Sequence, residues 1–363
     1  MTTRRRPVLA LDIGGTKLAV AVVTDDGRTH GLVIEPTHRD AGPDEVIRRL
    51  FDMGHRAIAA AGVGPVAAVG ISCGGPLDAR AGVLLGPLHL PGWNDVAIAA
   101  MAEDAFGVPA VLENDATVGA LAESRYGAAV GKPTVVYLTV STGIGGGAIV
   151  DGRLHRGAAG NGGEFGHVLV RSGGRPCLCG RRGCLEGYAS GSSIAERARE
   201  AVAERGADST LAALDDPRAE DVVAAATAGD PLARELWDET TELIGVAVTD
   251  LVNVFEPDMV VLGGGVTRSG EALFAPLRAA VARDAMPPAA AATTVVPAGL
   301  GDVVCVVGAA CVAFDLVDSL ATTTGTPAPE PAPAPTPSAV IRPTQHPRPA
   351  QGDTADLGEA THV

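Results

Sequence analysis

The sequence is poor in basic residues and has no long hydrophobic run. Its 363 residues include 28 Lys and Arg against 43 Asp and Glu, which gives a formal net charge of −15. Because proteins that bind nucleic acids present a basic surface, this balance argues against a nucleic-acid partner. The longest apolar run covers only Val303 to Phe314. A membrane-spanning helix needs about 20 apolar residues, so no membrane partner is expected.

A signal peptide is also missing, because the arginines near the start are not followed by an apolar segment and a cleavage site. We therefore expect a cytoplasmic protein. Its six cysteines are then expected to be reduced thiols or metal ligands. Cys73, Cys305 and Cys311 stand alone in apolar runs and are expected to lie in the core.

The hydrophobic fraction of 46% is ordinary for a globular protein, and the length suggests about two domains. Residues 321–363 differ from the rest. They are rich in Pro, Ala and Thr and show no apolar periodicity. Such a segment cannot bury enough apolar surface to offset its ordering entropy, so a disordered tail is expected.

Residues 1–320 are expected to form an α/β body, because short β-rich runs alternate with amphipathic segments. Strands are expected at 7–13, 17–23, 31–35, 66–72, 108–112, 134–140, 147–150, 153–155, 259–262 and 293–297. Helices are expected from 43 and at 95–106, 116–126, 191–203, 217–228, 231–254, 270–284 and 302–320. An opening of three strands and a helix occurs twice, which indicates two related domains facing one cleft.

The first glycine motif is DIGGTK at residues 12–17, where Asp12 ends a predicted strand and paired glycines follow. Glycines let backbone N–H groups approach a phosphate closely, and a carboxylate in this place suits a hydrated Mg²⁺. The Walker A pattern is absent. An ordinary Gly-Gly hairpin turn is the alternative.

Two further glycine motifs follow. STGIGGG at 141–147 contains a G-x-G-x-x-A match, with Glu164 about 20 residues later. A dinucleotide-binding glycine loop must open a helix, whereas a hairpin follows here, so we interpret this motif as a phosphate-binding β-hairpin bend. GGG at 263–265 lies between a strand and a helix. It would let a flat nucleotide base lie against the backbone, or it is a plain turn.

The segment Glu113-Asn114-Asp115 lies between a predicted strand and a helix. Asp115 is either the N-cap of a helix that begins at Ala116 or a general base for a substrate hydroxyl. A positioned carboxylate that accepts an alcohol proton is what phosphoryl transfer to an alcohol requires. Asn114 can donate to and accept from neighbouring hydroxyls.

A metal-binding pattern follows in the second half. It consists of one histidine and three clustered cysteines: His167, Cys177, Cys179 and Cys184. Cys₃His is a usual set for structural tetrahedral Zn²⁺; redox-active or inert thiols are the alternatives. Glu164 and Glu186 bracket this set, which makes them candidates for binding sugar hydroxyls rather than merely solvated glutamates.

Taken together, the motifs resemble those of the ROK family of sugar kinases and regulators, over residues 8–320. The shared motifs are LALDIGGTK, GISCGGPLD, ENDA, STGIGGG, GEFGH, CLCGRRGCLE and VVLGGGV. The resemblance implies a two-domain, hexokinase- and actin-like (ribonuclease-H-like) α/β fold with a cleft between the domains. The domains would be 1–117, joined by helix 302–320, and 118–301, which carries the zinc loop.

The resemblance further implies ATP-dependent phosphorylation of the 6-hydroxyl of a hexose, most often glucose, at the entry to glycolysis. Asp115 would be the general base. The hexose would contact Asn114, Asp115, Glu164, His167 and Glu186. The phosphates and Mg²⁺ would be held by Asp12, Gly14, Gly15, Thr16, Lys17, Thr142, Gly143 and Gly145, and adenosine by Gly263, Gly264 and Gly265. His167 would bind both the hexose and zinc, and the family suggests a homodimer or homotetramer.

The sequence departs from the family pattern at Ser141, where glycine is usual, and at Asn161-Gly162-Gly163 before Glu164. The second departure leaves open another hexose, such as fructose, mannose, allose or an N-acetylhexosamine. A sugar-sensing regulator is the alternative from another class. Repressors of the family carry a helix-turn-helix ahead of the sugar domain, for which no room is expected before Asp12. Polyphosphate-using relatives generally lack the cysteine block, which favours ATP as the donor.

Overall fold

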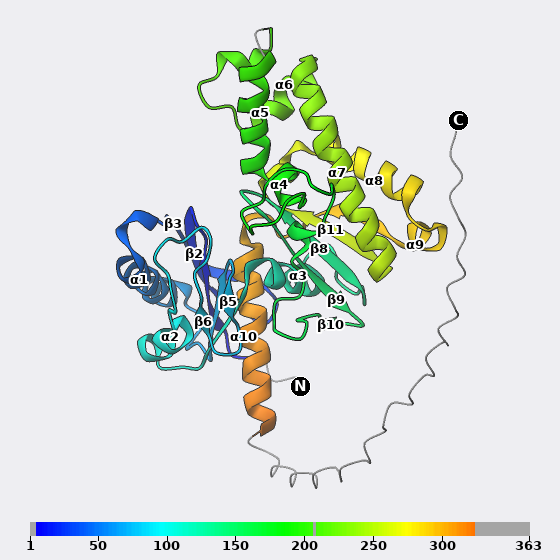
Figure 1. The fold of residues 1–363 in the computed structure, drawn as a ribbon. Coiled ribbons are helices and arrows are strands. Elements are labelled where there is room, and N and C mark those ends of the chain that lie inside the picture. The colour runs from blue at the N-terminus through cyan, green and yellow to red at the C-terminus, as the bar shows by residue number, and fades with distance from the viewer. Residues whose placement is uncertain (1–4, 206–207, 324–363) are drawn as a thin grey trace, which may run out of the picture.

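The computed structural model describes residues 5–205 and 208–323, and two five-stranded sheets form its framework (Figure 1). The first sheet has the order β3-β2-β1-β4-β7. Its strands are β1 (Val8–Ile13), β2 (Lys17–Val23), β3 (Thr29–Pro36), β4 (Val69–Cys73) and β7 (Ala110–Asn114). β2 is antiparallel to both β1 and β3, whereas β1, β4 and β7 are parallel.

The second sheet repeats this arrangement in the order β10-β9-β8-β11-β12. Its strands are β8 (Val135–Val140), β9 (Ile144–Val150), β10 (Arg153–Leu154), β11 (Met259–Gly263) and β12 (Thr294–Pro297). Here too the first three strands form an antiparallel meander and the last two run parallel to the first. The predicted α/β fold with two related halves is therefore confirmed.

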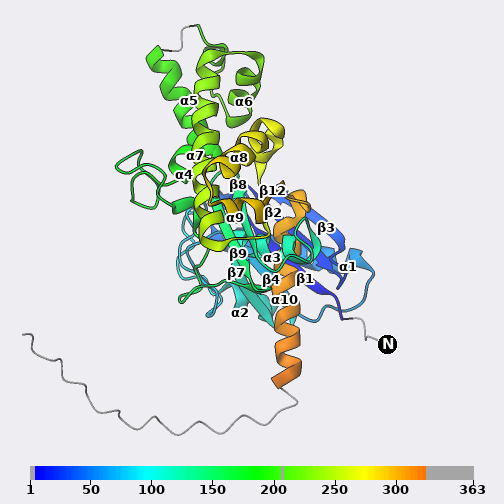
Figure 2. The same ribbon diagram turned by 90° about the vertical axis from the view of Figure 1, so that its right-hand side faces the viewer.

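Helices cover the faces of both sheets (Figures 1 and 2). The α-helices are α1 (Pro43–Ala61), α2 (Ile98–Phe106), α3 (Asp115–Tyr126), α4 (Glu186–Ala189), α5 (Gly191–Arg205), α6 (Ala219–Ala228), α7 (Pro231–Phe255), α8 (Glu271–Asp284), α9 (Pro287–Ala292) and α10 (Val304–Thr323). The 3₁₀ helices are η1 (Arg39–Ala41), η2 (Phe165–His167), η3 (Thr210–Ala213), η4 (Gly265–Ser269) and η5 (Gly301–Val303). β5 (Leu77–Asp78) and β6 (Val83–Leu84) form a small hairpin.

Burial on both faces of the first sheet explains why β1 is apolar from Val8 to Leu11, before Asp12. Side chains alternate along a strand, so Leu9 and Leu11 join the core beneath α1 and α2. Val8 and Ala10 point the other way, toward α10. α1 begins with Pro43 at its first turn, where the missing N–H costs nothing.

The two lobes meet along α3 and α10, and α10 runs between them in Figure 1. α10 packs against α3 and against β1 and β4. The helices approach closely because Gly308 has no side chain: a Cβ placed there would lie 2.3 Å from the carbonyl oxygen of Val118. Gly70 of β4 meets α10 in the same way, at the carbonyl oxygen of Ala309. Gly308 therefore sets how closely α10 approaches α3, and Gly70 sets how closely α10 approaches the first sheet.

Several predicted boundaries were wrong. The helix expected from Asp95 begins at Ile98, since Asp95 has a φ of 54° that a right-handed helix excludes. β4 begins at Val69 rather than Val66. The strand expected from Gly147 begins at Ile144, so the glycines at 145–147 belong to β9. Cys73 and Cys311 are buried as predicted, but Cys305 is only partly buried.

The C-terminal helix reaches Thr323, so the tail expected from Ala321 begins as helix; its remainder, 324–363, lies outside the described residues. Among the described residues one helix, Gly301–Thr322, is long and apolar enough to cross a membrane by length and composition alone. Half of its most apolar window is buried inside the protein. Its packing between a sheet and α3 is that of a core helix.

We expect Gly308→Ala to destabilise the protein by about 1–3 kcal/mol, the usual cost of overpacking a core, because the new methyl group meets the backbone of α3. Gly265→Ala is the control, since a methyl group there meets open space. Urea unfolding of both variants measures the difference. Equal free energies of unfolding for both would contradict the close-packing argument.

Candidate functional site

The carboxyl ends of β1, β4 and β7 meet at one edge of the first sheet, where they bring polar side chains together. Asp12 pairs in register with Ser72, and Ser72 with Glu113. The Ser72 hydroxyl donates to Asp12 Oδ1 at 3.0 Å, and the Asp12 side chain is almost fully buried. In open parallel sheets this edge is where ligands bind.

Asp115 begins α3 at this edge. Asn114, and not Asp115, is the N-cap: its Oδ1 accepts from the amides of Ala116 and Thr117 at 3.0 and 3.1 Å. Asp115 Oδ1 accepts from the Ala116 amide at 2.8 Å. Within the described residues, Asp115 Oδ2 has no hydrogen-bond partner. The structure therefore replaces the capping interpretation of Asp115 with a carboxylate that has one oxygen available.

Burial perturbs both carboxyl groups. It raises the pKa of Asp12 to about 7, and the charge of Asp115 adds to the rise, while Ser72 and Lys17 oppose it. Burial also raises the pKa of Asp115 above its ordinary value. The hydrogen bond from the Ala116 amide and the interaction with His89 lower it, but by less. The sequence alone gives Asp115 no reason to depart from an ordinary carboxyl pKa. The enclosure by the sheet edge and α3 is the missing cause.

The first glycine turn follows Asp12 in the chain, and the second lies beside Glu186. In the first, the Gly14 amide donates to the carbonyl of Lys17 at 3.0 Å and closes the β1–β2 bend. In the second, the Ser141 amide donates to the carbonyl of Gly143 at 2.9 Å. A Cβ on Gly143 would lie 2.9 Å from Glu186 Oε2, so the second turn borders the predicted hexose side.

The remaining predicted glycines have different surroundings. Gly145 lies in β9 under α3, where a Cβ would meet Ala116 at 2.7 Å, so helix packing alone demands glycine there. Gly263 ends β11 beside the Tyr137 hydroxyl, and Gly264 has a φ of 89°. Gly265 faces open space.

A cavity of about 910 Å³ opens beside the glycine turns. Three predicted residues, Thr16, Thr142 and Gly265, line it. Sequence reasoning missed several other lining residues, contributed by α5, α6 and η4 or the segments beside them: Gly191, Ser192, Arg218, Glu220 and Arg268. No motif marks them, since they are single polar or small residues in otherwise ordinary helical segments.

The four predicted metal ligands come together. The ligand atoms of His167, Cys177, Cys179 and Cys184 all lie within 4.8 Å of one another. Cys179 Sγ is 3.7 Å from Cys184 Sγ, and Cys177 Sγ is 3.6 Å from His167 Nδ1. Zinc–sulfur bonds of about 2.3 Å in a tetrahedron give ligand separations of about 3.8 Å. The donor set and spacing therefore fit a tetrahedral zinc ion.

The predicted hexose ligands lie around this cluster. Glu186 Oε2 accepts from the Ile144 amide at 2.8 Å, and its Oε1 is 3.8 Å from Cys177 Sγ. His167 Nε2 faces the half-exposed Glu164 at 3.8 Å, on the side of the ring away from the cysteines. Partial burial raises the pKa of Glu164; His167 opposes the rise, and Asp115 and Glu186 add to it. These charges therefore share one site.

His89 is a site residue that sequence reasoning missed. A Cβ on Gly15 would lie 2.7 Å from His89 Cβ, and one on Gly143 would lie 3.6 Å from His89 Nε2. The imidazole thus lies between the two glycine turns, and its charge acts on Asp115. Its only sequence signal is a lone histidine in a loop.

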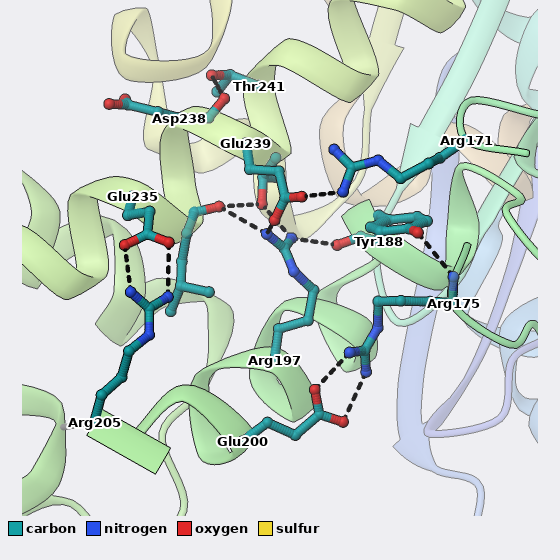
Figure 3. Close-up of polar contacts among 12 residues, drawn as sticks. Arg171, Arg175, Tyr188, Arg197, Glu200, Arg205, Glu235, Asp238, Glu239 and Thr241 are labelled. Carbon is teal, nitrogen blue, oxygen red and sulfur yellow. Dashed lines mark hydrogen bonds and ion pairs between the residues drawn. The ribbon is translucent and has the colours of Figure 1, made fainter. Parts of the chain in front are cut away.

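Three arginines hold the segment around the cysteines to the second lobe (Figure 3). Arg171 pairs with Glu239 of α7 at 2.7 Å, and Arg175 pairs with Glu200 of α5 at 2.9 Å. The buried Arg197 donates to the carbonyl oxygen of Tyr188 at 2.8 Å and also pairs with Glu239. α4, α5 and α7 therefore form one polar support beneath the predicted metal loop.

We expect Asp12→Asn to stabilise the metal-free protein by a few kcal/mol at pH 8. The folded state holds the Asp12 proton more tightly than the unfolded state, so Asp12 costs stability as pH rises from about 4 to 7. The gain should shrink near pH 4, where Asp12 is protonated in the folded state. Thermal unfolding between pH 4 and 8 measures both effects.

Asp230→Asn is the control, and it should change stability in the opposite direction by destabilising the protein at neutral pH. Asp230 caps α7, and its pKa is lowered to about 2, chiefly by hydrogen bonds from Ala233 and Thr210 that outweigh burial. Its contribution is present at neutral pH and lost as pH falls below about 4. A destabilising Asp12→Asn at pH 8 would contradict the assignment of a buried, unfavourable charge.

Comparison with known proteins places this geometry in a family. The sequence profile of the ROK family matches residues 8–315. A glucokinase from Thermotoga maritima is 34% identical over 284 residues, 77% of this chain and 88% of that protein. An N-acetylmannosamine kinase from Citrobacter koseri is 36% identical over 258 residues, 71% of this chain and 83% of that protein.

A solved structure agrees with both sequence comparisons. The ROK glucokinase from Streptomyces griseus, crystallised with glucose and AMPPNP, superimposes with a TM-score of 0.71 at 32% identity. The match covers 85% of this chain and 99% of that one. The chain belongs to the ROK family.

Proposed function

We propose that the protein is a kinase that transfers the γ-phosphoryl group of ATP to the 6-hydroxyl of a hexose, with glucose as the first candidate. One observation carries the proposal: Asp115 Oδ2 accepts no hydrogen bond among the described residues, and the charge of Asp115 acts on the buried Asp12, which begins the first glycine motif. Thr16 and Thr142 of the two glycine motifs line one cavity of about 910 Å³. Similarity to glucokinases, one of them solved with glucose and AMPPNP, supports the choice of substrates.

The nucleotide is assigned to the cavity and its glycine turns. Phosphates would be held by Asp12, Gly14, Gly15, Thr16, Lys17, Thr142, Gly143 and Gly145, and adenosine would lie against Gly263, Gly264 and Gly265. Gly265 supports the adenosine assignment, because it lines the cavity and carries open space above its backbone. Gly145 has the weakest support of these residues, because α3 covers it.

The hexose is assigned to the other side of Asp115, among Asn114, Asp115, Glu164, His167 and Glu186. Asn114 uses its carbonyl oxygen as the helix cap, so its amide N–H₂ remains for a hydroxyl. Carboxylates and imidazole suit sugar hydroxyls, because a carboxylate accepts from them and an imidazole can accept from or donate to them in a fixed direction. His167 would serve both ligands, with Nδ1 toward the cysteines and Nε2 toward the sugar.

Asp115 is the general base in this proposal. Its Oδ2 would accept the 6-hydroxyl proton while that oxygen attacks the γ-phosphorus and the bond to the ADP oxygen breaks. Burial raises the pKa of Asp115, and a higher pKa makes its carboxylate a stronger base. Closure of the lobes would exclude water from this transfer.

Two metal ions complete the proposal. Mg²⁺ would neutralise phosphate charge, and Asp12 would hold its hydration shell, which fits a buried carboxylate whose pKa is otherwise raised. Structural Zn²⁺ would bind His167, Cys177, Cys179 and Cys184. There it would fix the orientation of the His167 ring and of the neighbouring Glu186, a supporting role.

A kinase for another hexose is the second candidate. The segment Asn161-Gly162-Gly163 departs from the commonest glucokinase pattern, and one relative is an N-acetylmannosamine kinase. Fructose, mannose and allose belong to the same alternative, since the phosphoryl chemistry is unchanged. A non-catalytic sugar sensor is a third possibility, which the presence of Asp115 and both glycine turns disfavours.

The remaining assignments concern the whole protein. We place it in the cytoplasm, supported by six cysteines that form no disulfide. We propose domains 1–117 with helix 302–320, and 118–301, which follow the two sheets. A homodimer or homotetramer is proposed from the family resemblance.

We expect Asp115→Ala to fold normally and bind hexose but to lose about 10²–10⁴-fold in kcat, the usual contribution of a general base. ADP release from Mg-ATP, measured across glucose, fructose, mannose, allose and N-acetylhexosamines, gives both the activity and the preferred sugar. Asp104→Ala, at an exposed position of α2, is the control. Turnover near that of the wild type in Asp115→Ala would exclude Asp115 as the base.

We expect Cys179→Ser to lose bound zinc and to raise the KM for hexose at least about tenfold, with the KM for ATP little changed, because His167 and Glu186 lose their orientation. Cys311→Ala, a buried cysteine outside the loop, should keep its metal. Metal content by mass spectrometry and steady-state kinetics test this. Full activity after chelation would refute a structural role for zinc.

A further inference from the structure

Glu113 is a buried carboxylate that the proposed mechanism does not use. It lies in β7, at the edge of the first sheet, directly before Asn114 and Asp115. Its side chain is only 3% exposed. Oε1 accepts from the Asn114 amide at 3.1 Å, and Oε2 accepts from Arg156 Nε at 2.9 Å. Glu113 therefore holds the start of the catalytic segment on one side and an arginine on the other.

Arg156 belongs to the other lobe. It follows β10, the edge strand of the second sheet, and its carbonyl oxygen accepts from the Gly162 amide at 2.9 Å. The loop of residues 155–164 then leads to Glu164, so we call it the hexose loop. This loop is fastened to its own lobe by ring contacts of His155 and Phe165 with Phe255 of α7. The Arg156–Glu113 bond thus joins β7 of the first sheet to the loop that follows β10 of the second.

The two side chains of the Arg156–Glu113 pair differ in exposure, and this difference determines what the loss of either one costs. The Arg156 side chain is about half exposed, whereas Glu113 is enclosed. Among the described residues, Arg156 is the only basic side chain paired with Glu113. Removing one partner of such a pair leaves a buried charge without compensation, which costs more than the loss of an exposed ion pair.

We propose that the Arg156–Glu113 ion pair is an interlobe latch that positions the hexose loop over Asp115, and that Arg156 thereby sets the affinity for the hexose. The inference rests on the proposed function and deepens it. Arg156 touches no reacting atom in this arrangement, so it is a positioning residue. Its influence should fall on hexose binding, because its loop carries Glu164, whereas the nucleotide cavity is lined by other segments.

The test compares Arg156→Met, Arg156→Lys, Glu113→Gln and the double variant Glu113→Gln/Arg156→Met. Arg153→Met is the matched control: Arg153 lies exposed on β10 of the same hairpin and has no ion pair within the described part of the chain. We expect Arg156→Met to raise the KM for hexose about tenfold, with kcat and the KM for ATP within about twofold of the wild type. Arg156→Lys should recover part of the loss, because it restores the charge without the planar fork.

The double variant separates positioning from folding. Without the Glu113 charge it should regain thermal stability lost in Arg156→Met and still show the raised KM for hexose. An unchanged KM for hexose in Arg156→Met, or a reduced kcat with KM unchanged, would overturn the proposal. Recovery of the wild-type KM in the double variant would do the same, since the buried charge alone would then explain the effect.

Hydrogen exchange of the substrate-free protein tests the latch without relying on kinase activity. Peptides covering 155–164 should exchange faster in Arg156→Met and Glu113→Gln than in the wild type or Arg153→Met. Equal exchange in all four proteins would show that no latch holds the loop. If the wild type phosphorylates no hexose but the exchange difference is present, the proposed function fails and the interlobe latch stands.

Discussion

The close crossing of α3 and α10 is the contact on which the rest of the structure depends. α10 lies on β1 and β4, whose ends carry Asp12 and Ser72, while α3 begins with Asp115. The absence of a side chain at Gly308 lets the two helix backbones touch. At the far end of α3, the buried Glu123 accepts from the amides of Ala128, Gly299 and Leu300. Both ends of α3 are thus fixed, and with them the position of the candidate base.

That rigidity has an electrostatic consequence. Asp12 and Asp115 are held close in a protein that is already strongly acidic, and burial raises the pKa of each. Lys17 opposes the rise in the pKa of Asp12, and His89 opposes the rise in the pKa of Asp115, but neither cancels the effect of burial. Among the described residues neither carboxyl group has a salt bridge, and enclosed carboxyl groups of this kind are typical of functional sites rather than of structural cores. A cation or the proton of a substrate hydroxyl would relieve the effect of burial.

The sequence predicted what depends on local pattern. The repeated strand order, the glycine turns and the Cys₃His set are all marked by residues close together in the chain. The two sheets share that strand order, and the four predicted metal ligands lie within 4.8 Å of one another. His89, Arg156 and Ser192 could not be predicted, because each is a single residue whose neighbours come from distant elements. Asn114 and Asp115 could not be told apart as helix caps, since both residue types favour that position. The hydrogen bonds that the Asn114 side chain accepts from the amides of Ala116 and Thr117 identify Asn114 as the cap.

The predicted metal loop is supported in two different ways in its outer and inner parts. Its outer part is held to α5 and α7 by Arg171, Arg175 and the buried Arg197, through contacts that need no metal (Figure 3). The inner part, where His167 and the cysteines converge, lacks such ion pairs among the described residues apart from Glu164. A metal there would therefore add orientation rather than attachment. Its removal should loosen the His167 ring and Glu186 while the loop stays on its lobe, so hexose affinity would change before the fold does.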